Sequence, residues 1–70
     1  MQTYYQKSLT DKGLIPDGID PRHVEAYARL QYGTLSHLDW SEIRRETKIA
    51  VACIREDRMG AESLAQSFGL

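Results

Sequence analysis

The chain has 70 residues and one cysteine, and its nine basic and ten acidic side chains leave a net charge of −1. This length allows a single domain, residues 1–70, and excludes a second one. A lone cysteine excludes an internal disulfide and a zinc site built from several thiolates. The near balance of charge gives no general attraction to nucleic acid or anionic lipid, so such binding would need a local patch.

Targeting and metal signals are absent from the sequence. The first residues lack the basic stretch and apolar run of a secretory signal. The longest apolar run has six residues, 49–54, whereas a membrane-spanning helix needs roughly 20. We therefore expect a cytoplasmic protein that does not enter a membrane. Nothing brings carboxylates around His23 or His37, so we expect no metal and no cofactor.

Residues 1–20 are predicted to form an amino-terminal arm, with a short helix over 3–12 and then a connector. Thr3 and Gln6 have the spacing of a capping box, and Gly13 is a suitable terminator. The connector is too rich in glycine, proline and aspartate to form regular structure. We expect its apolar residues to hold it against the core: Leu14, Ile15 and Ile19.

A second helix is predicted over 21–32. Asp20 is a good N-cap, the first helical position is a proline, and Gly33 supplies the left-handed residue that ends many helices. Glu25 precedes Arg29 by four residues, which is the favourable order for an ion pair on a helix surface. We therefore expect these two residues to form a surface pair.

A third helix is predicted over 40–57, because Asp39 and Glu42 form a capping-box pattern. At about 100° per residue, its main apolar stripe is formed by Trp40, Ile43, Thr47, Ala50, Val51 and Ile54. Ile49 and Cys53 fall on a second strip, so the run 49–54 is apolar on two sides. Such a segment needs cover from most of the remaining protein or from a second copy. A single helical turn is predicted in the preceding linker, which begins at Thr34.

A last helix is predicted over 61–68, with apolar residues spaced i, i+3, i+4 and i+7. Gly69 and Leu70 then suit a Schellman-type ending. No stretch alternates between apolar and polar residues as a strand does. The fold class that follows is all-α, a compact three- or four-helix bundle with short loops.

Residues 62–70, with the order Leu-Ala-Gln-Ser-Phe-Gly-Leu at their end, resemble the first helix and turn of helix-turn-helix DNA-binding domains. In that family the pattern leads into the recognition helix that enters the major groove. Here the sequence ends where that helix would begin, so the resemblance implies a helix, a turn and a cap. We do not expect this mode of DNA binding.

The leading functional hypothesis is protein–protein interaction, with self-association as a homodimer, because few other helices are available to cover the second strip. Burial of an exposed isoleucine contributes about 1.5–3 kcal/mol. The candidate interface residues are Ile49, Ala52, Cys53, Phe68 and Leu70. The partner is a second copy of the chain or another protein.

The alternative hypothesis is a small nucleic-acid-binding or regulatory protein that uses a basic helix face. Its candidate phosphate contacts are Arg44, Lys48 and Arg55, which align along the third helix. Interspersed acidic residues favour an ordinary solvated face instead: Glu42, Glu46, Glu56 and Asp57. No nucleophile and base have a recognisable arrangement, and Cys53 is expected to be a small apolar residue, so we do not expect an enzyme.

Overall fold

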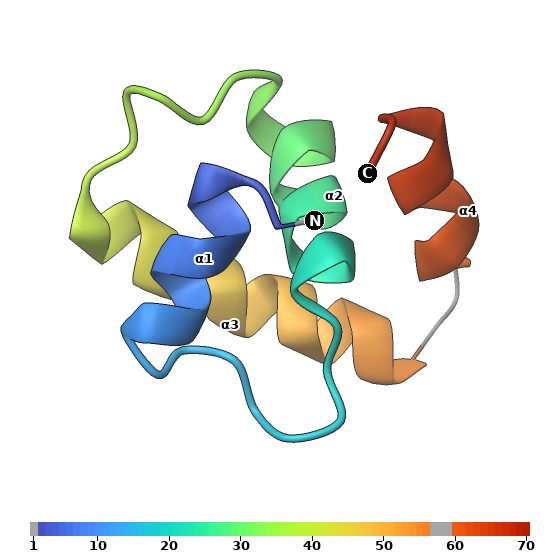
Figure 1. Cartoon of the computed structure of the whole chain (residues 1–70), viewed down its shortest axis with the longest axis horizontal. Helices are drawn as coiled ribbons and strands as arrows, with labels where there is room; N and C mark the ends of the chain where they lie inside the picture. The colour runs from blue at the N-terminus through green and yellow to red at the C-terminus, as the bar shows by residue number, and fades with distance from the viewer. Residues whose placement is uncertain (1, 57–59) are drawn as a thin grey trace.

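Helix α2 lies at the centre of the structure, and the other three helices pack around it (Figure 1). The computed structural model describes residues 2–56 and 60–70. They form four helices: α1 (Tyr4–Asp11), α2 (Pro21–Tyr32), α3 (Trp40–Glu56) and α4 (Ala61–Ser67). The described residues contain no strand, so the predicted all-α bundle is confirmed.

Each predicted helix matches an observed one to within one residue at either end. Asp57, the predicted last residue of the third helix, lies outside the described residues. Among the helices that are described, none combines the length and the apolar composition required to cross a membrane.

The first three helices begin at the side-chain caps that the sequence predicts. The Thr3 hydroxyl oxygen accepts a hydrogen bond from the Gln6 N–H at 3.2 Å. The Asp20 carboxylate accepts one from the Arg22 N–H at 2.9 Å. At the start of α3, the Glu42 N–H donates to Asp39 Oδ1 (2.8 Å) and the Asp39 N–H donates to Glu42 Oε1 (3.2 Å). These bonds satisfy backbone N–H groups that a helix start leaves without partners.

Schellman motifs end α1 and α4. The Leu70 N–H donates to the Ala65 carbonyl at 2.8 Å, and Gly69 supplies the required positive φ of 77°. At the end of α1, the Leu14 N–H donates to the Leu9 carbonyl at 3.0 Å. Because Leu14 and Leu9 both pack in the core, this motif also fixes the start of the connector.

The middle of helix α2 is buried on every side, since five consecutive residues, 24–28, are buried. The core cluster consists of Leu9, Val24, Tyr27, Ile43, Ala50, Val51 and Ala61, and the three predicted connector residues pack against it. The sequence suggested that the run 49–54 of the third helix would need cover on nearly all sides. Within the chain this cover is incomplete, since Ile49 is 51 % exposed and α4 packs on α2. Cover by a second copy stays a prediction.

Two expectations are corrected. Trp40, predicted to be core, is 39 % exposed, and the Lys12 ammonium at the end of α1 lies 4.7 Å from its ring centroid. The Lys12 ammonium thus makes a cation–π contact with this partly exposed ring. The linker that starts at Thr34 contains no helical turn; it has a single tight turn, closed by a 3.3 Å bond from the Leu38 N–H to the Leu35 carbonyl.

Candidate functional site

A groove of about 420 Å³ lies along one side of α3, between this helix and the connector that joins α1 to α2. Clefts that bind ligands commonly have volumes of about 300–1,000 Å³. The groove is lined by Gly13, Leu14, Pro16, Arg44, Thr47, Lys48, Val51, Ala52 and Arg55. It therefore combines apolar surface with three basic side chains.

Helix geometry explains why these α3 residues meet at one groove. Positions 44, 48, 51, 52 and 55 are separated by four, three, one and three residues, a spacing that places them on one face at about 100° per residue. The opposite wall comes from the connector, which its own apolar residues hold against the core. The sequence predicts the basic row but not this second wall.

The three basic side chains of the groove have no anionic partner in the described part of the chain. Arg44, Lys48 and Arg55 are all exposed, and no ion pair joins any of them to a described carboxylate. By contrast, Arg22 and Arg29 both pair with carboxylates. Unpaired charges along a groove with low-dielectric walls concentrate a positive potential there.

The acidic residues expected to balance this basic face do so only in part. Glu46 is buried, and Glu42 is engaged in the cap of α3. Glu56 is exposed, and Asp57 lies outside the described residues. The exposed side of α3 is therefore more basic than its sequence suggests.

The groove unites residues from both hypotheses. It contains all three candidate phosphate contacts together with Ala52 of the candidate interface. Ile49 is exposed but is not part of the groove lining, and Cys53 packs partly against the core. Phe68 and Leu70 follow α4, which packs on α2. The five-residue interface thus stays a prediction, with its members divided between α3 and the end of α4.

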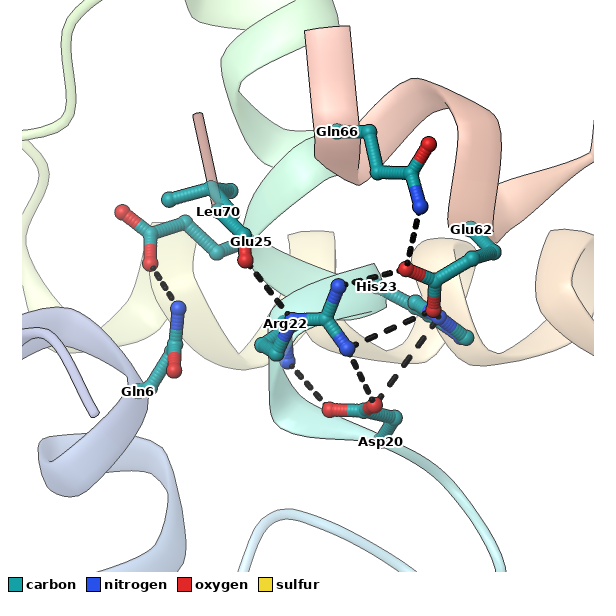
Figure 2. Close-up of polar contacts among 8 residues, drawn as sticks. All are labelled: Gln6, Asp20, Arg22, His23, Glu25, Glu62, Gln66 and Leu70. Carbon is teal, nitrogen blue, oxygen red and sulfur yellow. Dashed lines mark hydrogen bonds and ion pairs between the residues drawn. The ribbon is translucent and has the colours of Figure 1, made fainter. Parts of the chain in front are cut away.

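A polar clamp, formed by Asp20, Arg22, His23, Glu62 and the Leu70 carbonyl, ties α4 to the first turn of α2 (Figure 2). Arg22 Nη2 lies 2.6 Å from Glu62 Oε2, and Arg22 Nη1 lies 3.3 Å from Asp20 Oδ2. Its Nε also donates to the Leu70 carbonyl at 2.8 Å. Arg22 therefore holds both the first turn of α4 and the chain's last residue, across separations that sequence patterns do not show.

The clamp contains the one group of described residues that lies close enough to hold a cation. Ligand atoms of Asp20, His23 and Glu62 lie within 4.8 Å of one another, and His23 Nε2 is 3.0 Å from Glu62 Oε1. Arg22 already places its positive charge between the two carboxylates, so a metal ion would have to displace it. The arrangement is better suited to attach α4 than to bind metal.

Glu25 is buried, which corrects its prediction as half of a surface pair. Arg29 does donate to Glu25 Oε2, from Nε at 3.0 Å, with Nη2 at 2.9 Å. The other oxygen, Oε1, accepts from the Thr3 hydroxyl at 2.5 Å. It also accepts from Gln6 Nε2 at 2.8 Å (Figure 2). Every donor except Arg29 comes from α1 or its cap, so this carboxylate joins α1 to α2.

Burial also changes the acidity of two neighbouring groups. It raises the pKa of Glu46, an effect that a hydrogen bond from Tyr32 partly offsets. It raises the pKa of Tyr5 to about 12, and the negative charge of Glu46 adds to this shift. Tyr5 lines a second cavity of about 430 Å³, whose wall includes Glu25 and Arg29, already bonded to each other. We therefore interpret Tyr5, Glu25 and Arg29 as residues that pack α1 against the rest of the structure.

No protein-family model, curated protein or solved structure matches this chain. The α3 groove is accordingly the feature from which function has to be argued. Its apolar surface and its three cations, which no described carboxylate pairs with, have the chemistry to receive an anionic and partly apolar ligand.

Replacement of the buried carboxylate tests its role in joining α1 to α2. In Glu25→Gln, the new amide group must face either the donors from α1 or the Arg29 guanidinium, which is also a donor. The variant keeps one acceptor oxygen in place of two and loses the negative charge that pairs with Arg29, so we expect a loss of about 1–3 kcal/mol of unfolding free energy. Urea denaturation followed by circular dichroism measures this. Asp17→Asn, at an exposed connector position, is the control; equal midpoints for both variants would contradict the role.

The clamp predicts a defined pH dependence. Hydrogen bonds from Arg22, and then from His23, lower the pKa of Glu62 from 4.5 to about 2. A carboxylate with a lower pKa in the folded state stabilises that state above its unfolded pKa. This contribution should be lost as the pH falls from about 4.5 to about 2. The difference in urea midpoint between wild type and Glu62→Gln should therefore shrink across this range. A constant difference for Glu62→Gln across this range would contradict the clamp.

Proposed function

We propose that the protein is a protein-binding module that acts through the groove side of α3. The observation that carries this proposal is the combination in one groove of apolar surface with three cations that have no ion-pair partner among residues 2–56 and 60–70. Protein interfaces combine an apolar centre with a polar, charged rim, and complementary charge increases the rate and specificity of association.

Nucleic acid is a less suitable partner for this groove. Phosphate contacts need the cations but not the apolar surface, and single strands are usually held by stacking on aromatic side chains. The described lining contains no aromatic residue. Leu14, Pro16 and Val51 instead provide aliphatic surface that suits the side chains of another protein.

A symmetric pair of these chains is also less suitable. In a two-fold interface each surface faces its own copy, so Lys48 and its basic neighbours would meet like charges. The exposed part of Ile49 lies outside the groove lining, and isolated exposed apolar residues are common on monomers. The proposed partner is therefore a different protein.

Site-specific photocrosslinking tests the proposal. A benzoylphenylalanine placed at Ala52, in the groove, should form an adduct with another protein in cells that produce the chain. The same group at Tyr4, which is 88 % exposed on α1, is the matched control. We expect a discrete adduct from position 52 that is absent from position 4, with its identity established by mass spectrometry.

Other products would contradict the proposal. An adduct of twice the 8.0 kDa chain mass would show self-association at this face. A nuclease-sensitive adduct would show nucleic acid binding. No adduct at position 52, or equal adducts at both positions, would show that the groove side of α3 has no specific protein partner.

A further inference from the structure

We infer that the groove binds an acidic, amphipathic helix of its partner protein. This inference rests on the proposed function and specifies the chemistry of the segment that would occupy the groove. It is supported by three properties of the groove: its apolar surface, the spacing of its cations and the absence of a matching segment elsewhere in the described chain.

The apolar surface calls for aliphatic side chains on the occupant. Leu14 and Pro16 of the connector face the groove together with Val51 and Ala52 of α3. The α3 residues that line the groove run from Arg44 to Arg55, so a segment that contacts all of them would lie along α3. Helix-in-groove recognition uses such a surface to receive the apolar side of an amphipathic helix.

The cations call for carboxylates at helical spacing. Arg44 and Lys48 are four residues apart and Lys48 and Arg55 are seven, which corresponds to rises of about 6 and 10 Å along α3. Separations of four and seven residues also keep side chains on one face of a partner helix. An occupant helix with carboxylates at positions i, i+4 and i+11, or in the reverse order i, i+7 and i+11, matches all three cations.

The described helices of this chain do not offer such a segment to a second copy. Helices α1, α2 and α4 each contain one acidic residue: Asp11, Glu25 and Glu62. Glu25 is buried and Glu62 is held by Arg22, so neither is free to enter the groove of another molecule. The remaining helix, α3, carries the basic row itself. The occupant is therefore a segment of a different protein.

A designed peptide tests this chemistry directly. The probe is a fluorescent 18-residue helical peptide with a leucine stripe and three glutamates at positions i, i+4 and i+11 beside it. One control peptide replaces the glutamates with glutamines, and a second has the same composition in scrambled order. Fluorescence anisotropy with the full chain should show saturable binding of the probe, weakened by salt. Both control peptides should bind at least about tenfold more weakly.

Matched protein variants locate the binding. Lys48→Glu should weaken binding of the probe by about tenfold, because one attraction becomes a repulsion. Lys7→Glu makes the same charge change at an exposed position on α1 and should leave binding unchanged. Ala52→Phe should block the groove, whereas Gln31→Phe, at an exposed position on α2, should not. Circular dichroism verifies that each variant is folded.

The outcomes separate this inference from the proposed function. Equal binding of the glutamine peptide, or equal binding by Lys48→Glu, would overturn the acidic segment; equal binding of the scrambled peptide would overturn the amphipathic helix. A protein adduct at position 52 without any binding of the probe would overturn the inference and leave the proposed function intact. Displacement of the probe by duplex DNA at equal charge concentration would favour nucleic acid and overturn both.

Discussion

Burial of α2 is the constraint on which the rest of the structure depends. Its five consecutive buried residues require cover on every side, and the described part of this 70-residue chain has three other helices to supply it. Helix α1, the apolar side of α3 and helix α4 are all used for this purpose. Since α4 packs on α2, it does not cover the groove side of α3. The open face that we interpret as the binding surface is thus a consequence of how the core is closed.

Polar contacts attach the two shortest helices to this centre. Helices of eight and seven residues have little stability of their own, so α1 and α4 depend on what holds them to α2. Glu25 binds donors from α1 and its cap, and Arg22 binds both the first turn of α4 and the last residue of the chain. Both residues lie in the first half of α2. This half of α2 therefore contributes to the apolar core and also carries the polar contacts that hold α1 and α4.

Local interactions explain why the helices were predictable from the sequence. Caps such as Asp20, and the Gly69 ending, act within a few residues, so their spacing predicts helix bounds to within one residue. Burial depends on contacts between distant residues. In the sequence Glu25 looks like half of a surface pair with Arg29. Its contact with Thr3, which lies 22 residues away, is not visible in a local pattern. The basic row of the candidate site was likewise visible in the sequence. Its second wall depends on the side of α3 along which the connector runs, and no local signal predicts that side.

The packing of α4 on α2 leaves one face of α3 open, and the solvent exposure of methyl groups measured by NMR tests this link most directly. With a soluble paramagnetic reagent in the buffer, the methyl signals of Ile49 and Ala52 should broaden strongly, whereas those of Ala26 and Ala28 in α2 should be protected. Equal protection of Ile49, Ala52 and the α2 alanines in the isolated protein would show that α4 or a second copy covers α3. That result would contradict the central claim.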